Sequence, residues 1–249
     1  MPYLLFLFVA LALAASTLVN PPVEPVARAA VQPVVVLELF TSQGCSSCPP
    51  ADRALQELTQ QAARAGQAVY GLSFHVDYWN RLGWQDPFSS KQFTDRQRQY
   101  DRLLKTQTYT PQLIINGRQD VIGGQRSRIE QAIRSIQQQP ASAFIGVDGS
   151  LTQDAGQVTV NYSLSAKGPY RVNVALLQKE ARTAVRNGEN GGRTLLNTNV
   201  VRQFITTELT SASGRVILSY PYDLTANQTS VLIYVQRSDT GQVVGARRL

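Results

Sequence analysis

The chain is organised around one stretch in which an apolar run leads through a polar turn into two cysteines and two prolines. It reads Val34-Val35-Val36-Leu37-Glu38-Leu39-Phe40-Thr41-Ser42-Gln43-Gly44-Cys45-Ser46-Ser47-Cys48-Pro49-Pro50. A short apolar run of this kind predicts a central strand buried on both faces. The prolines predict the first turn of a helix, where backbone amides lack partners within the helix. A strand and a helix are therefore expected to meet at the cysteines.

Cys45 and Cys48 are the only two cysteines among 249 residues. A disulfide between them would close a very short loop, so it would remove little entropy from the unfolded chain and be a weak staple. The pair is better suited to making and breaking a disulfide. We expect Cys45 to be the attacking thiolate, stabilised by helix amides and the macrodipole, and the shielded Cys48 to resolve mixed disulfides.

Other roles for this cysteine pair are a static structural bond and a metal site. A closed zinc site needs four ligands, and the chain adds only one histidine, His75, to the two cysteines. Together the three could hold copper. Alternatively, His75 could stabilise the Cys45 thiolate and act as acid and base, or it could be a hydrogen-bonded structural residue.

The chain up to residue 140 alternates strands and helices. After the helix that begins near Pro49, residues 68–76 predict a second strand, which implies a parallel pair with a right-handed crossover. An aromatic loop (77–88) and a polar helix (89–105) follow. Asn116-Gly117 between two apolar runs predicts a β-hairpin, and 125–139 predicts a last helix. Beyond residue 140 we expect roughly seven short alternating strands, typical of a β-sandwich.

The first 15 residues resemble a secretory signal peptide, with a wholly apolar segment followed by small residues, although no Lys or Arg precedes it. Residues 16–33 form a proline-rich spacer. We expect a secreted or periplasmic protein with no membrane association in its mature form; the alternative is an uncleaved N-terminal anchor that faces outside the cytoplasm. The formal charge of +7 is spread thinly, without a basic stripe interleaved with aromatics, which argues against nucleic-acid binding.

Several motifs resemble a family of secreted bacterial thioredoxin-like proteins of unknown function. They are Glu38 to Asp52, Phe74-His75-Val76-Asp77-Tyr78-Trp79, Gly83-Trp84-Gln85-Asp86-Pro87-Phe88, Tyr109-Thr110-Pro111-Gln112, and the stretch from Gly188-Glu189-Asn190 to Val200-Val201-Arg202. The resemblance implies a thioredoxin-like α/β fold over residues 34–140, followed by an all-β sandwich-like domain over 141–249. It covers most of residues 34–249.

The resemblance also implies roles for individual residues. The proline before the third strand is cis in thioredoxins and lies beside the disulfide, which corresponds to Thr110-Pro111 here, with Pro111 shaping the substrate groove. Glu38 resembles their buried proton-transfer acid, although it lies seven residues before Cys45, one more than usual. It could equally be an acid paired with an arginine. Tyr78, Trp79 and Trp84 could line the groove or form the loop's own small core.

We therefore expect a thiol–disulfide oxidoreductase that uses Cys45 and Cys48, needs no cofactor, and acts on protein or small-molecule thiols and disulfides. The Ser46-Ser47 dipeptide departs from that of working thioredoxins, so the direction of electron flow and the substrate cannot be carried over. The alternative is a binding protein, with copper on Cys45, Cys48 and His75 or with a static disulfide, that docks a partner through the β domain. The sequence does not predict an oligomeric state.

Overall fold

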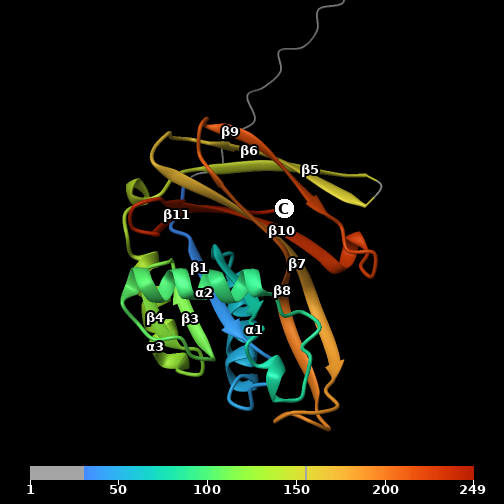
Figure 1. The fold of residues 1–249 in the computed structure, drawn as a ribbon. Helices are drawn as coiled ribbons and strands as arrows, with labels where there is room; N and C mark the ends of the chain where they lie inside the picture. The colour runs from blue at the N-terminus through green and yellow to red at the C-terminus, as the bar shows by residue number, and fades with distance from the viewer. Residues whose placement is uncertain (1–30, 155) are drawn as a thin grey trace, which may run out of the picture.

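The computed structural model describes residues 31–154 and 156–249 (Figure 1). The predicted signal peptide and the first part of the spacer lie outside the described residues. Among the helices of the described residues, none has the length and hydropathy needed to cross a membrane.

The helices and strands before residue 140 follow the predicted order. Residues 116 and 117 both have positive φ at the turn between two antiparallel strands, so the predicted hairpin is confirmed. The first two strands are parallel, also as predicted. The elements are β1 (Val35–Thr41), α1 (Pro49–Arg64), β2 (Val69–His75), α2 (Lys91–Leu104), β3 (Gln112–Ile115), β4 (Gln119–Ile122) and α3 (Arg126–Gln137).

Seven further strands follow, and they divide between two sheets. One sheet has eight strands in the order β11-β10-β7-β8-β2-β1-β3-β4, and a three-stranded sheet has the order β5-β6-β9. Figure 1 shows the smaller sheet stacked over β7, β10 and β11. The later strands are β5 (Val147–Asp154), β6 (Gln157–Leu164), β7 (Tyr170–Ala184), β8 (Thr194–Glu208), β9 (Ser213–Ser219), β10 (Thr229–Arg237) and β11 (Val243–Arg248).

The predicted fold class is wrong. The chain does not divide into a thioredoxin-like α/β core and a separate β-sandwich, because strands from both halves share the eight-stranded mixed sheet. The two halves join where β8 lies parallel to β2, with Val200 opposite Ser73. The Ser73 hydroxyl also donates to the carbonyl of Thr198 at 2.9 Å. The structure is mostly β, with a few helices.

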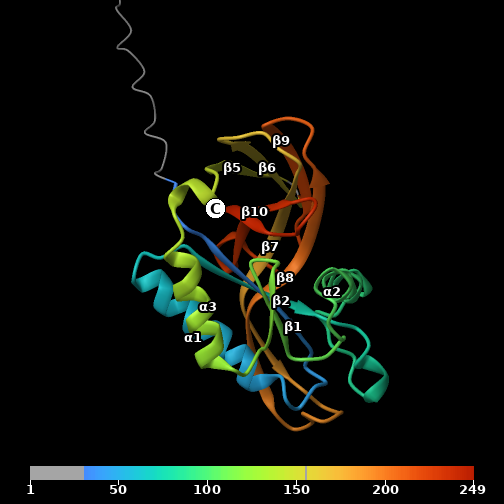
Figure 2. The same ribbon diagram turned by 90° about the vertical axis from the view of Figure 1, so that its left-hand side faces the viewer.

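Three hydrophobic clusters pack against the sheets, and the one that contains residues of both halves explains why the large sheet is continuous. Helices α1 and α3 pack on one face of β1 and β3, and the small sheet packs on β7 and β10. The third cluster lies under α2 and contains residues from both halves, among them Phe40, Phe74, Phe204 and Tyr234. Figure 2 shows α2 on the opposite side of the sheet from α1 and α3. Burial of this shared aromatic surface holds the two halves together.

Candidate disulfide site

Cys45 and Cys48 form a disulfide in the turn between β1 and α1, with their Cα atoms 5.4 Å apart. Neither cysteine is exposed, whereas Ser46 and Ser47 between them are exposed. The turn is tight, since the amide of Cys48 donates to the carbonyl of Cys45 at 3.2 Å. The disulfide therefore lies just beneath a polar surface loop and out of contact with solvent.

Hydroxyl groups surround the sulfur of Cys45. The Thr110 hydroxyl donates to Cys45 Sγ at 3.4 Å, and Ser47 Oγ lies 3.3 Å from the same sulfur. Trp79 Nε1 donates to Thr110 Oγ1 at 2.8 Å and so orients it. A Cys45 thiolate would accept hydrogen bonds from these hydroxyls, and such bonds favour the charged form.

The helix amides expected to stabilise that thiolate are not the donors. Cys48 itself is the N-cap of α1, and the next two residues are prolines, which have no amide proton. The amides of Ala51 and Asp52 both donate to the carbonyl of Cys48, at 2.9 and 3.1 Å. The hydroxyls of Thr110 and Ser47 take the place of those amides.

The tip of the long β7–β8 hairpin covers the cysteine turn. Asn190 is fully buried there, and its side-chain amide donates to the carbonyls of Gln43 and Cys45, both at 2.9 Å. The neighbouring Glu189 accepts from the amide of Ser46 at 2.9 Å. Figure 1 shows this hairpin reaching beyond the end of β1 to the start of α1. The C-terminal half of the chain thus supplies the cover of the disulfide.

A buried group of ionisable side chains lies beneath the turn. Asp52 is four residues after Cys48 on α1, which places both residues on one face of the helix. His75, at the end of β2, makes a 2.7 Å contact from Nδ1 to Asp86 Oδ2, and Asp86 also accepts from the amide of Gln43. Asp52 Oδ1 and His75 Nε2 are buried and lack a partner within the described residues.

The pKa values within this group are shifted. Burial raises the pKa of Asp52 to about 6, although the neighbouring imidazole of His75 opposes the shift. Burial lowers the pKa of His75, but Asp86 beside it and, to a lesser extent, Asp52 together raise the pKa more, so the net shift is upward. The pKa of Asp86 falls below its usual range: burial opposes this, and His75 together with the amides of Gln43 and Phe88 outweighs the effect of burial. Asp52 is therefore the carboxyl group that can carry a proton close to neutral pH.

The raised pKa of Asp52 predicts a pH-dependent stability. The carboxyl binds its proton more tightly in the folded protein, so its contribution is full below pH 3.8 and is lost as the pH rises through about 6. We expect Asp52→Asn to be more stable than wild type at pH 8, by roughly 3 kcal/mol at most, and similar at about pH 4. Urea unfolding at both pH values measures this. Asp148→Asn on an exposed strand is the control, and an unchanged pH dependence in Asp52→Asn would contradict the assignment.

His75 is held by Asp86 rather than by the cysteines. Its ring also packs edge-on against Phe88, with the centroids 5.4 Å apart. Within residues 31–154 and 156–249, no group of three His, Cys, Asp or Glu side chains has an arrangement that could hold a metal ion. The structure gives no support to a copper site made of Cys45, Cys48 and His75.

Glu38 is not part of this group. It forms a two-pronged ion pair with Arg96 of α2, with N–O distances of 2.6 and 3.0 Å, and accepts from the Tyr100 hydroxyl at 2.5 Å. Residues on either side of it, Leu37 and Leu39, pack with α1, so Glu38 points to the opposite face of the sheet. The structure shows the pairing with an arginine that the sequence left as the alternative.

The remaining predicted groove residues lie at different distances from the disulfide. The Thr110–Pro111 bond is cis, as the resemblance implied, and Pro111 is buried. Trp84 Nε1 donates to Gln43 Oε1 at 3.2 Å, and this hydrogen bond helps to hold Gln43 and the cysteine turn in place. Tyr78 packs against the cluster under α2, and its hydroxyl is buried without a partner in the described part of the chain. Thr110 thus reaches the sulfur and is oriented by Trp79, whereas Tyr78 contributes to the core.

Sequence reasoning missed several residues of the site. Asp52 had a signal, because it is an acid on the apolar face of a helix that buries Ala51 and Leu55. Asp86 lies in the aromatic loop without a comparable signal. Asn190 has none either, since nothing local connects it to Cys45, which lies 145 residues earlier.

Comparisons with known proteins assign the chain to a family. No curated protein matches the sequence. A crystal structure of a protein from Agrobacterium tumefaciens is 32% identical, with a TM-score of 0.66, over 86% of this chain and 93% of that one. A domain of the outer membrane lipoprotein Omp28 from Porphyromonas gingivalis is 16% identical, with a TM-score of 0.25, over 42% of this chain and 85% of that one. Residues 36–236 match the family described as "Protein of unknown function (DUF1223)", and the chain belongs to that family.

Proposed function

We propose that the protein is an exported thiol–disulfide oxidoreductase that exchanges its Cys45–Cys48 disulfide with thiols of proteins or small molecules. The arrangement of two groups around the disulfide carries the proposal. The sulfur of Cys45 accepts a hydrogen bond from Thr110, while Asp52, with a pKa of about 6, lies one helical turn beyond Cys48. A purely structural bond needs neither group, whereas exchange needs a stabilised thiolate and a proton carrier.

The exchange proceeds in two steps. A partner thiolate attacks Cys45 Sγ, the bond between Cys45 and Cys48 breaks, and the electron pair leaves on Cys48 Sγ, which takes up a proton from Asp52. A second partner thiolate then attacks the partner's sulfur in the mixed disulfide. The Cys45 thiolate leaves, so two partner thiolates have become one disulfide and the protein has gained two electrons. The reverse sequence oxidises the protein.

The potential of the disulfide tests this function. Equilibration of the protein with mixtures of reduced and oxidised glutathione, followed by alkylation of free thiols and mass measurement, gives the value. We expect a potential above about −300 mV, the range of exchangeable disulfides. A value far below that limit identifies a static structural bond, the alternative favoured by the complete burial of both cysteines.

The tip of the β7–β8 hairpin should limit the rate at which a reductant reaches the disulfide. Asn190→Ala leaves two buried carbonyls without their donor, which costs about 1 kcal/mol for each hydrogen bond and favours local opening of the tip. We expect the disulfide to be reduced by a phosphine roughly tenfold faster than in wild type, with an unchanged potential. Asn187→Ala, exposed in the same tip, is the control. Equal rates in all three proteins would show that the tip does not restrict access.

A further inference from the structure

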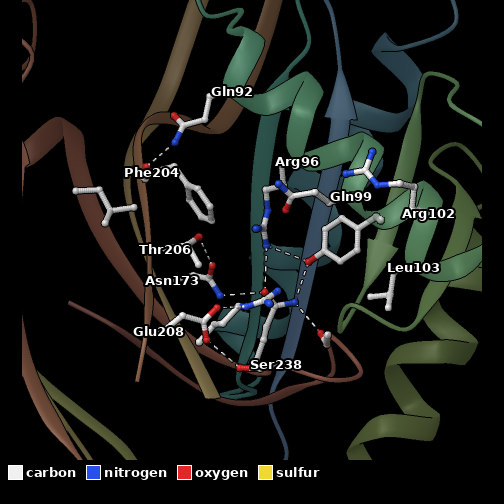
Figure 3. Close-up of a pocket in the computed structure, with 15 residues that line it drawn as sticks. Gln92, Arg96, Gln99, Arg102, Leu103, Asn173, Phe204, Thr206, Glu208 and Ser238 are labelled. Atoms are coloured by element: carbon white, nitrogen blue, oxygen red, sulfur yellow. Dashed lines mark hydrogen bonds and ion pairs between the residues drawn. The ribbon is translucent and has the colours of Figure 1, made fainter. Parts of the chain in front are cut away.

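A second site lies on the face of the sheet that α2 covers. An open pocket of about 900 Å3 lies between α2 and the strands β7, β8 and β10, within the range of about 300–1,000 Å3 found for ligand pockets. Figure 3 shows Arg96 descending from α2 beside the ring of Phe204, with Asn173 and Thr206 opposite. Neither cysteine lines this pocket, nor does any residue that bonds directly to them.

The floor of the pocket is a network of polar side chains that satisfy one another; Asn173, Gln236 and Tyr100 are buried, and Thr206 is exposed. Thr206 donates to Asn173 at 2.7 Å, and Asn173 donates to Gln236 at 3.0 Å. Gln236 in turn donates to the Tyr100 hydroxyl at 2.9 Å. A network saturated in this way holds its members in fixed positions.

One nitrogen of the pocket floor, Nη1 of Arg96, has no hydrogen-bond partner among the described residues. The hydrogen bonds of Arg96 are made by Nε and Nη2. The side chain is only 10% exposed, and its guanidinium lies 4.5 Å from the centre of the Phe204 ring. A guanidinium fixed by a carboxylate and by aromatic faces presents its free edge in one direction, toward the pocket that it lines.

Charge and hydrophobicity define the class of ligand. The pocket is lined by three arginines and one glutamate, and Glu38 beneath it pairs with Arg96, so one positive charge is left in excess and favours an anion. Glu208 is already bound by Arg171 at 2.6 Å, and the described residues provide no ion-pair partner for Arg102 at the rim. Leu103 is 43% exposed beside it, and Ile205 lines the opposite wall. The pocket thus offers a few cationic N–H donors together with apolar walls.

We propose that this pocket binds a small organic carboxylate with an apolar body. One carboxylate oxygen accepts from Arg96 Nη1, Arg102 approaches from the rim, and the body lies against Phe204, Leu103 and Ile205. The few available donors match a carboxylate better than a phosphate, which has three acceptor oxygens to satisfy. The site is independent of the disulfide, so it stands or falls separately from the exchange activity.

Calorimetric titration with 4-phenylbutyrate and with its uncharged amide tests the proposal. We expect saturable binding of the carboxylate, with a Kd on the order of 1 mM or tighter, and binding of the amide at least about tenfold weaker. Equal binding of the two probes, or no saturable binding of 4-phenylbutyrate, overturns the proposal.

Two matched variants locate the binding. Leu103→Asp adds a negative charge and removes apolar surface at the rim, so we expect carboxylate binding to weaken by about tenfold or more. Leu151→Asp changes a leucine of similar exposure, 41%, on β5 outside the pocket, and should bind as wild type does. Thermal unfolding of both variants confirms that they are folded. Unchanged binding by Leu103→Asp places the carboxylate elsewhere and overturns the assignment.

Discussion

Cys48→Ser should accumulate a mixed disulfide that wild type does not. In this variant Cys45 keeps its hydrogen-bond donors, Thr110 and Ser47, so its thiolate can still attack a disulfide such as oxidised glutathione. Resolution of that mixed disulfide, the last step of the reverse sequence, needs Cys48 Sγ to attack Cys45 Sγ and release the glutathione thiolate, and serine cannot do this. We expect mass spectrometry to find one glutathionyl group on nearly every Cys48→Ser molecule, while catalytic exchange falls by about two orders of magnitude.

Cys45→Ser provides the opposite test. Both cysteines are buried, but Cys48 is the N-cap of α1, followed by two prolines without amide protons, and no side chain of the described residues donates to its sulfur as Thr110 does to Cys45. We therefore expect little adduct on Cys45→Ser and the same loss of exchange. An adduct that forms on Cys45→Ser but not on Cys48→Ser would reverse the two roles. If neither variant forms an adduct and wild type exchanges with no thiol, the proposed function is lost.

Local features of the fold could be predicted because short-range patterns determine them. Pro49 and Pro50 mark the start of α1, and Asn116-Gly117 marks the β3–β4 turn. The pairing of β2 with β8 had no such signal. It joins residues 73 and 200, far apart in the chain, and the apolar alternation of β7 and β8 suits a sandwich as well as an extended sheet. The sequence therefore suggests a separate β domain, whereas the structure has an eight-stranded sheet that runs through both halves of the chain.

The same distinction applies to the residues of the site: those within short motifs could be predicted, and those brought together from distant parts of the chain could not. Cys45 and Thr110 could be found from motifs, and the structure places their side chains in contact. Asn190 could not, because only the 15-residue strands β7 and β8 carry the hairpin tip to the cysteine turn. Glu38 was ambiguous for a different reason. A strand buried on both faces does not reveal which side chains face the helix that carries the cysteines.

Loss of the Glu38 charge should strongly destabilise the protein. Arg96 is nearly enclosed between Phe204, Tyr100 and the sheet, and Glu38 is its carboxylate partner at 2.6 and 3.0 Å. Glu38→Gln leaves a buried guanidinium without a counter-charge, at a cost of about 3–5 kcal/mol. Urea unfolding measures this loss. Glu57→Gln, which breaks the exposed ion pair with Arg126, should cost less than about 1 kcal/mol.

A double variant separates the charge from the packing. Replacing Glu38 and Arg96 together by methionine removes both buried charges, so we expect much of the stability lost in Glu38→Gln to return. The exchange rate per folded molecule should stay at the wild-type value in Glu38→Gln, because Glu38 points to the face opposite the helix that carries Cys48 and bonds to Arg96 instead. A fall in that rate without loss of stability would make Glu38 a proton carrier after all. A small cost of Glu38→Gln would mean that the buried guanidinium is compensated by its tyrosine and glutamine partners alone.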